Sequence, residues 1–233
     1  MTPQKKLYLH EEIMLLALKD KEGTIHSGTN YAMALGGALL AELLLSNRIA
    51  VETQKKKKFA KLIDTTPFGE PVLDEGLEKI KKAKKRQQLQ TWVSRFSGIK
   101  NLKNRTAYQL IQRGILRADE DKVMLIFTRK LYPEVNPIPE KELVERLREA
   151  IFTDTEDINP RTVVLLSLAN STQLLKLDFD KKELKKRKNR IEQVVNGEIT
   201  GKATKEAIEA MQAAIMVACI MPAIIVTTTT AAH

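Results

Sequence analysis

Apolar residues surround nearly the whole circumference of four predicted helices. These segments lie near residues 11–18, 29–46, 160–175 and 206–226. A helix at a protein surface keeps one polar face, so a helix that is apolar on all sides is typical of an interior. The pattern therefore predicts a central bundle of these helices. In the third of them, Asn159 is expected to cap the start and Pro160 to occupy the first helical position.

Other segments are amphipathic or polar and are expected to wrap this bundle. Between residues 138 and 152, Leu143, Leu147, Ala150 and Ile151 recur at the spacing of a helix that lies on a core. Further helices of this kind are predicted at residues 74–96, 101–113 and 180–195, while the central helix near 11–18 is expected to span residues 9–20.

Two β-hairpins are predicted between the helices. The strands "RIAVE" and "KFAKLI" flank the basic turn "TQKKKK", and the stretch "GILRADEDKVMLIFTRKLYPEVNP" indicates two strands joined by an Asp/Glu turn. The helix at 101–113 and this second hairpin are expected to lie on the outside of the bundle. The predicted fold is a single, mainly α-helical domain over residues 1–233, with a hydrophobic central bundle, surrounding amphipathic helices and one projecting β-hairpin.

The composition agrees with a globular, mostly helical protein. Of 233 residues, 43% are hydrophobic, 29% are charged and only 5% are aromatic. The single cysteine, Cys219, excludes an internal disulfide and a cysteine-rich zinc site. Residues 1–25 carry acids within their apolar part and lack the continuous apolar core of a signal peptide, so no secretion signal is expected.

The formal net charge of +10 points to an anionic partner, which could be nucleic acid, a lipid surface or an acidic protein. The segment from Lys79 to Arg105 contains ten basic residues and no Asp or Glu. Within it, Lys100 and Lys103 are three residues apart at a predicted helix start, where unpaired backbone N–H groups favour a phosphate. The basic stretch 181–190 is interpreted instead as a solvated helix surface.

Motifs for catalysis are absent from the sequence. It contains no phosphate-binding loop, no H-E-x-x-H zinc motif and no dinucleotide fingerprint. His10, Glu11 and Glu12 are neighbours in "LHEE", but adjacent residues of a helix point in different directions, so we expect no metal site there. We therefore expect neither enzyme activity nor a cofactor.

Several stretches, in the same order along the chain, resemble the Golgi phosphoprotein 3 family. They include "LYLHEEIMLLALKDKEGTI", "LGGALLAELLLSNRIAVE", "QLIQRGILRADEDKVMLIF" and "YPEVNPIPEKELVERLREAI". The resemblance implies an all-α domain with a hydrophobic central bundle and a projecting hairpin. Eukaryotic members are peripheral proteins of the cytoplasmic Golgi face that bind phosphatidylinositol 4-phosphate and act as adaptors for glycosyltransferases. The short chain resembles a minimal, bacterial-type member.

The resemblance also implies a headgroup pocket made of a tryptophan, an arginine on the following helix and two arginines three residues apart. Local matching places these positions on Ser27, Gly36, Lys100 and Lys103, and Arg105 completes the predicted headgroup contacts. Lysine binds phosphate as a point charge, whereas arginine forms two parallel hydrogen bonds, and Ser27 and Gly36 do not keep the family's chemistry. Binding to phosphatidylinositol 4-phosphate or another anionic phospholipid is therefore expected, with the lipid species left open.

Five consecutive apolar residues in the second hairpin are candidates for membrane contact. They are Val123, Met124, Leu125, Ile126 and Phe127, followed by Arg129, Lys130 and Tyr132. An apolar wedge can enter the acyl boundary while basic neighbours hold phosphates. The alternative is a strand buried within the protein or against a second copy, and in the family the hairpin is implicated in both membrane contact and self-association. The expected partners are an anionic membrane, a second copy of the chain and membrane-protein cargo.

Two other interpretations remain open. A helix followed by a basic hairpin also describes a winged helix, so a nucleic-acid-binding module is the chief alternative. Residues 210–232 carry no charge, and this segment is long enough for a membrane anchor, although Pro222 and Gln212 reduce its apolar character.

Overall fold

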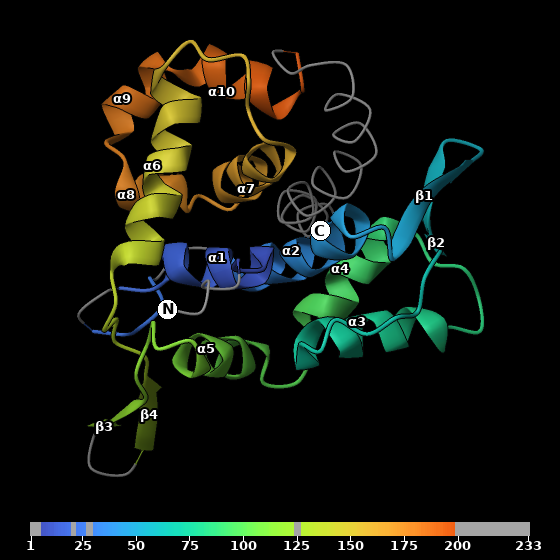
Figure 1. The fold of residues 1–233 in the computed structure, drawn as a ribbon, viewed down its shortest axis with the longest axis horizontal. Coiled ribbons are helices and arrows are strands. Elements are labelled where there is room, and N and C mark those ends of the chain that lie inside the picture. The colour runs from blue at the N-terminus through green and yellow to red at the C-terminus, as the bar shows by residue number, and fades with distance from the viewer. Residues whose placement is uncertain (1–5, 20–21, 27–29, 124–126, 199–233) are drawn as a thin grey trace, which may run out of the picture.

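A computed structural model describes the backbone of residues 6–19, 22–26, 30–123 and 127–198. These residues form ten helices and two separate antiparallel hairpins. The mainly helical fold predicted from the sequence is confirmed. Figure 1 shows α1 and α2 running across the middle of the molecule, with α3, α4 and α5 on one side and α6 to α10 on the other.

The centre consists of α1 (Leu9–Ala17), α2 (Tyr31–Leu45) and α7 (Pro160–Ser171), which contact one another. Every residue of α1 is buried, as is most of α2 and α7. The Asn159 side chain accepts a hydrogen bond from the backbone N–H of Arg161, so the predicted cap of α7 is confirmed. These three helices confirm the central bundle, whereas the fourth predicted segment, 206–226, lies outside the described residues.

The remaining helices cover this centre. They are α3 (Pro71–Lys81), α4 (Leu89–Ser97), α5 (Leu102–Gln112), α6 (Ile138–Phe152), α8 (Leu175–Asp178), α9 (Lys181–Lys186) and α10 (Lys188–Val195). The predicted stripe of α6 is confirmed, because its four apolar residues are all buried. Within the described part of the chain, no helix is long and apolar enough to cross a membrane. The candidate anchor at 210–232 lies outside that part.

The single polar helix expected over residues 74–96 is wrong. The structure has two helices there, α3 and α4, separated by a connection with the basic sequence Lys84–Lys85–Arg86. The Glu70 side chain caps α3 by accepting a hydrogen bond from the Leu73 N–H. The second helix is amphipathic rather than polar, because Leu89, Trp92, Val93 and Phe96 are buried. The helix expected at 180–195 is likewise two helices, α9 and α10.

The first hairpin agrees with its prediction. In it, β1 (Ile49–Gln54) pairs with β2 (Lys57–Leu62), and Ile49 lies opposite Leu62. Lys55 and Lys56 form the tight turn with positive φ angles of 46° and 64°.

The second hairpin projects from the molecule (Figure 1), but its turn is not the predicted one. Its strands are β3 (Asp119–Val123) and β4 (Phe127–Leu131), and Val123 pairs with Phe127. The acidic residues Asp119 and Glu120 therefore lie in β3, and the connection falls on residues 124–126, outside the described set. A projecting two-stranded ribbon tolerates exposed charges in its strands, because it has no buried face at these positions.

Candidate functional site

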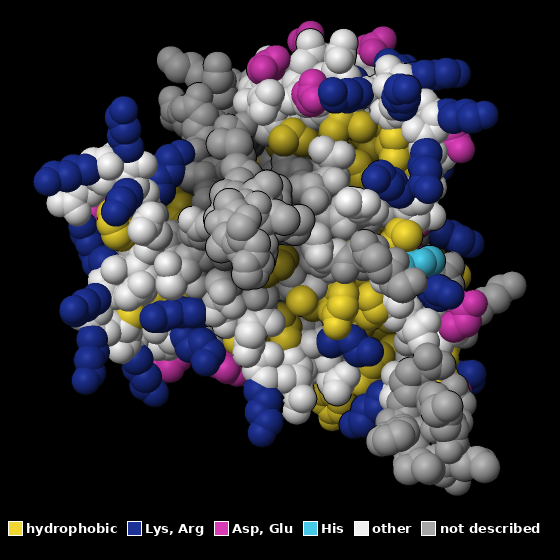
Figure 2. Space-filling model, turned by 180° about the vertical axis from the view of Figure 1, so that it is seen from behind, with side chains coloured by type: hydrophobic (Ala, Val, Ile, Leu, Met, Phe, Trp, Pro, Cys, Tyr) yellow, Lys and Arg dark blue, Asp and Glu magenta, His cyan; other side chains and the backbone are white. Residues whose placement is uncertain are grey.

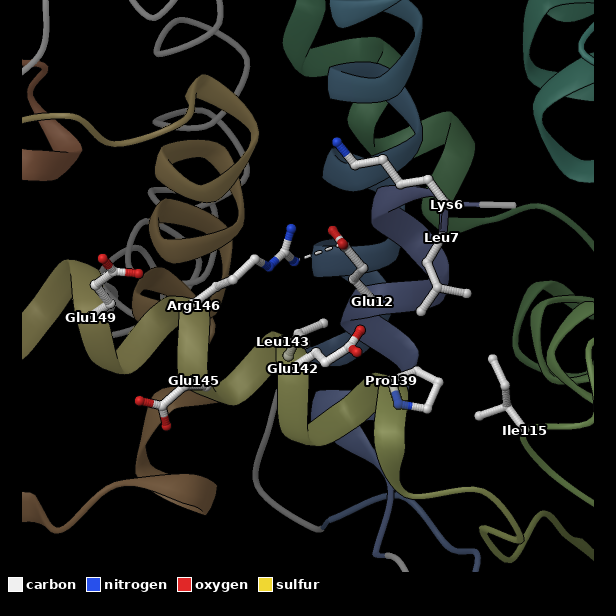
Figure 3. Close-up of a pocket in the computed structure, with 10 residues that line it drawn as sticks. All are labelled: Lys6, Leu7, Glu12, Ile115, Pro139, Glu142, Leu143, Glu145, Arg146 and Glu149. Atoms are coloured by element: carbon white, nitrogen blue, oxygen red, sulfur yellow. Dashed lines mark hydrogen bonds and ion pairs between the residues drawn. The ribbon is translucent and has the colours of Figure 1, made fainter. Parts of the chain in front are cut away.

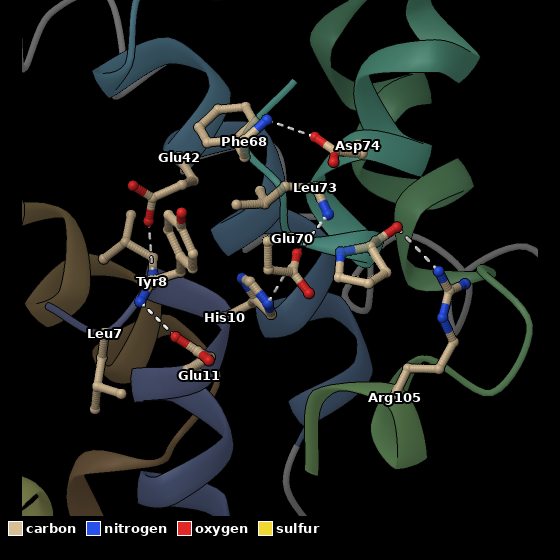
Figure 4. A network of polar contacts seen from close by, with 12 residues as sticks. Leu7, Tyr8, His10, Glu11, Glu42, Phe68, Glu70, Leu73, Asp74 and Arg105 are labelled. Atoms are coloured by element: carbon tan, nitrogen blue, oxygen red, sulfur yellow. Dashed lines mark hydrogen bonds and ion pairs between the residues drawn. The ribbon is translucent and has the colours of Figure 1, made fainter. Parts of the chain in front are cut away.

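The polar residues His10 and Glu11 of α1 are buried and point to different elements (Figure 4). His10 Nε2 lies 3.6 Å from a carboxylate oxygen of Glu70, the residue that caps α3. Glu11 accepts a 2.8 Å hydrogen bond from Nε of Arg113 at the end of α5. Burial opposes ionisation of Glu70, but the contact with His10 and the bond from Leu73 outweigh it and hold its pKa below the ordinary value.

Glu12, the next residue of α1, faces the other half of the molecule. It accepts a 2.7 Å hydrogen bond from Arg146 of α6, and Nε of Arg161 in α7 lies 3.5 Å from its second oxygen. Arg161 also donates two hydrogen bonds to Glu42 of α2, at 3.0 and 2.9 Å. Burial raises the pKa of Glu12 despite these cations. The "LHEE" segment thus connects α1 to four other helices through buried charge.

A cavity of about 660 Å³ opens beside this network, between α1 and α6 (Figure 3). Three glutamates of α6, Glu142, Glu145 and Glu149, line it, together with Glu12 and Arg146. Carboxylates repel anionic headgroups, so this cavity does not suit a phospholipid phosphate. Among the described residues, no group of His, Cys, Asp and Glu has the arrangement of a metal site.

The predicted lysine pair lies at the junction of α4 and α5. Ile99 and Leu102 are buried on either side of Asn101, whose φ of 56° turns the chain sharply into α5. Lys100 precedes this turn and is exposed, whereas Lys103 is the second residue of α5 and is half-buried. The first turn of α5 contains no acid, so its unpaired N–H groups and both lysines attract an anion.

Lys103 also lies at the base of the second hairpin. Its Nζ is 5.7 Å from the ring centroid of Tyr132, which directly follows β4 and is buried. Burial raises the pKa of this tyrosine. The Tyr132 N–H donates to the carbonyl of Gly23, which lies in the turn after α1 and has a φ of 60°. The lysine at the candidate headgroup site and the candidate membrane hairpin are therefore neighbours in space.

A small cavity of about 220 Å³ separates α5 from the hairpin base. Asn104, Tyr108, Asp119, Glu120, Lys130 and Tyr132 contribute to its lining. The two carboxylates make its interior unfavourable for a phosphate. A headgroup is therefore expected on the side of Lys100, outside this cavity.

Arg105, the third predicted cation, has a structural contact. Its guanidinium forms a hydrogen-bonded ion pair with Glu75. It also donates a 3.0 Å hydrogen bond to the Pro71 carbonyl, the dashed line at Arg105 in Figure 4. Both partners belong to α3, so Arg105 fastens α5 to α3. A headgroup contact by Arg105 would compete with this ion pair.

Gly36 is buried where α2 crosses α4. A Cβ at this position would lie 2.5 Å from the Val93 carbonyl oxygen and 2.7 Å from the Ser97 nitrogen. The glycine therefore permits close approach of the two helices. The contacted residue Ser97 precedes Lys100 by three residues along the chain. Its position adjoins the candidate site, but it offers no side chain to a headgroup.

The other predicted positions remain predictions. Ser27 and the hairpin residues Met124, Leu125 and Ile126 lie outside the described residues. Val123 and Phe127 are placed by backbone pairing alone, at the outer end of the ribbon.

Comparison with known proteins identifies the family. The Golgi phosphoprotein 3 (GPP34) family model matches residues 9–211. The chain belongs to this family. Vacuolar protein sorting-associated protein 74 of Eremothecium gossypii is 25% identical over an alignment of 219 positions that covers 78% of this chain. The match covers 66% of that relative, so this chain spans just under two thirds of its length.

Sequence reasoning missed a second group of basic residues within the segment 79–105. Lys84 and Arg95 line a cavity between α3 and α4 together with Trp92. The absence of acids from the segment indicated an anion site, but it did not separate these residues from Lys100 and Lys103. A single continuous helix, as predicted, would have no space between α3 and α4, so the cavity could not be anticipated.

Proposed function

We propose that this chain is a non-catalytic peripheral membrane protein that binds an anionic phospholipid headgroup through Lys100 and Lys103. The observation that carries the proposal is the position of Lys103, with Nζ 5.7 Å from the ring of Tyr132 at the base of the β3–β4 hairpin. A headgroup held at the start of α5 would be close to a ribbon that projects from the molecule. One membrane surface could then contact both.

The charge distribution supports an anionic surface as the partner. The chain carries a formal net charge of +10, and Lys and Arg side chains gather on the left of the face in Figure 2, where α3 and the β1–β2 hairpin lie. A basic residue near an anionic membrane contributes about 1 kcal/mol to binding. The net positive charge would therefore attract the protein to an anionic membrane, and Lys100 and Lys103 would hold it there.

The proposed lipid is phosphatidylinositol 4-phosphate or another anionic phospholipid. Lysine ammonium groups attract phosphate without the two-bond geometry of arginine, and Gly36 supplies no guanidinium. Selectivity among anionic headgroups is therefore expected to be modest. Family membership supports an adaptor role at a membrane, on the cytoplasmic Golgi face in a eukaryotic cell, with membrane-protein cargo and self-association through the hairpin as further parts of the proposal.

The direct test is co-sedimentation with neutral vesicles and with vesicles that contain phosphatidylserine, phosphatidylglycerol, cardiolipin or phosphatidylinositol 4-phosphate. Replacing Lys100 and Lys103 together by Ala should weaken binding to anionic vesicles by about 1 kcal/mol per lysine. The loss should shrink as salt rises, because charges are screened within about 8 Å at physiological ionic strength.

The matched control replaces Lys185 and Lys186 by Ala, which removes the same charge from the exposed α9. Equal losses in the two variants would show that attraction is diffuse and that no specific pair exists. Tighter binding to duplex DNA than to any vesicle, lost in the Lys100/Lys103 variant, would favour the nucleic-acid interpretation.

The hairpin has a separate test. Changing Met124 and Leu125 to Asp should reduce vesicle binding at constant lipid charge, while the free energy of unfolding changes by less than about 0.5 kcal/mol. A control with Ile63→Asp and Thr65→Asp adds the same charge at two exposed positions beyond β2. A large loss of stability in the hairpin variant would instead indicate that these two residues are buried in the protein.

A further inference from the structure

A cavity of about 700 Å³ lies between α3 and α4, apart from the start of α5. We propose that it binds a phosphate-bearing anion, with Arg95 and Lys84 as the cations and the Trp92 ring as the wall on which Arg95 stacks. This inference does not depend on the function proposed for Lys100 and Lys103.

Trp92 supplies the first argument. Its side chain lines the cavity and is 1% exposed, so the indole ring is held rigidly in the wall between the two helices. The Nε1 atom itself is inaccessible, so Trp92 offers an aromatic surface to the cavity rather than a hydrogen-bond donor. The negative face of an indole ring attracts a cation, which it can hold beside the cavity.

Arg95 supplies the second argument. It follows Trp92 by one helical turn, and its guanidinium carbon lies 5.1 Å from the indole ring centroid. The Arg95 side chain is exposed, and within the described part of the chain it forms no ion pair. A planar guanidinium that already stacks on an aromatic ring can still present its N–H groups to an oxyanion.

The charges around the cavity leave an excess of cations. Glu75 and Glu78 also line it, but Glu75 pairs with Lys79 at 3.3 Å and Glu78 pairs with Lys82 at 3.0 Å. The hydrogen bond from Lys82 holds the pKa of Glu78 below its ordinary value, so this carboxylate is ionised and neutralises that lysine. Arg105 is a second partner of Glu75.

Lys84 remains after this pairing. It lines the cavity, is exposed and has no carboxylate partner among the described residues. Two cations of different geometry that lack a carboxylate partner, around a single space, match a tetrahedral oxyanion, which accepts hydrogen bonds from several directions. The volume lies in the range of sites for small organic ligands, so a phosphomonoester fits better than a bare ion.

Trp92 is the only tryptophan of the chain, so its fluorescence reports on this cavity directly. The probes are inorganic phosphate, glycerol 3-phosphate, and vesicles that contain phosphatidic acid. We expect a saturable change of emission. Saturation by glycerol 3-phosphate in solution identifies a soluble phosphomonoester as a sufficient ligand, whereas a change with vesicles alone identifies a lipid headgroup.

The variants are Arg95→Ala and Lys84→Ala, and Lys85→Ala is the matched control because Lys85 is an exposed neighbour that does not line the cavity. Each of the first two should weaken binding at least about tenfold, measured by calorimetry as well as fluorescence, and the control should leave it unchanged. The Lys100/Lys103 double variant should keep the emission change, which separates this site from the proposed one. The absence of saturation with every probe, or an equal loss with Lys85→Ala, would overturn the proposal.

Discussion

Two regions of this molecule use the same charged side chains in opposite ways. Around α1, the guanidinium groups of Arg113, Arg146 and Arg161 each meet a buried carboxylate. Over α3, α4 and the start of α5, the cations of Lys84, Arg95 and Lys100 have no carboxylate partner in the described part of the chain. Burial and pairing, rather than residue type, therefore decide whether a cation holds helices together or stays accessible to an anion.

The largest expected effect comes from breaking the buried network. Arg161→Met leaves Glu42 without its cation and Glu12 with Arg146 alone, and removing one partner of a buried pair costs about 3–5 kcal/mol. Urea denaturation should show this loss in the free energy of unfolding. Vesicle binding by the folded fraction should stay unchanged, because the two regions are separate.

The control for this variant is Lys188→Ala, which removes an exposed pair with Glu192 at 3.6 Å. Exposed pairs contribute at most about 1 kcal/mol, so its stability should hardly change. If Arg161→Met lowered the free energy of unfolding by less than about 1 kcal/mol, the buried pairs around α1 would contribute no more than exposed pairs do.

An intermediate effect on stability is expected from a substitution where α2 crosses α4. Gly36→Ala puts a methyl group 2.5 Å from the Val93 carbonyl oxygen, and forced overpacking costs about 1–3 kcal/mol. Thermal unfolding should show the loss. Gly76→Ala is the counterpart, because its Cβ would meet the Phe96 ring at an ordinary 3.6 Å, and alanine favours a helix by about 0.5–1 kcal/mol. Equal changes in the unfolding temperature of the two variants would show that the close approach of the helices at Gly36 does not contribute to stability.

The smallest effect is a difference in pH dependence between two buried glutamates. The pKa of Glu12 is raised, so its contribution to stability is fully present below its unfolded value of 4.5 and is lost as pH rises through the folded pKa. The pKa of Glu70 is lowered, so its contribution is present above 4.5 and is lost as pH falls through the folded pKa.

Substituting each glutamate by Gln should therefore change the pH profile in opposite directions. Relative to the parent, Glu12→Gln gains stability as pH rises from about 4 to 7, and Glu70→Gln loses it over the same interval. Unfolding free energies measured across this interval give both slopes. Slopes of the same sign would show that the two environments do not differ as described.

Local sequence signals predicted much of the fold. The all-round apolar segments became α1, α2 and α7, and Asn159 with Pro160 marked the start of α7 correctly. The boundary between α3 and α4 was not predicted. The connection around Lys84 is polar, and so is most of the sequence on either side of it, so the change from helix to connection leaves no mark in the pattern of polar residues. Asp119 and Glu120 were assigned to a turn, since composition does not reveal that both belong to an exposed strand.

The candidate site was predictable only where it is local. Lys100 and Lys103 lie at a helix start, as spacing and the acid-free context predicted. The proximity of Lys103 to Tyr132 depends on how the hairpin packs against α5, which no short sequence window contains. The same holds for Arg105, whose partner Glu75 is 30 residues away, and for the cavity at Trp92.

The pair formed by Glu42 and Arg161 has a consequence for how the protein is made on the ribosome. The two residues are 119 positions apart, and synthesis at roughly 5–20 residues per second separates them by about 6–24 s. During that interval α1 and α2 have left the ribosome with Glu12 and Glu42 still lacking the cation that later joins them. The sides of α1 and α2 that pack against α7 therefore stay uncovered until α7 has been made, and exposed apolar surface of this kind is what chaperones bind.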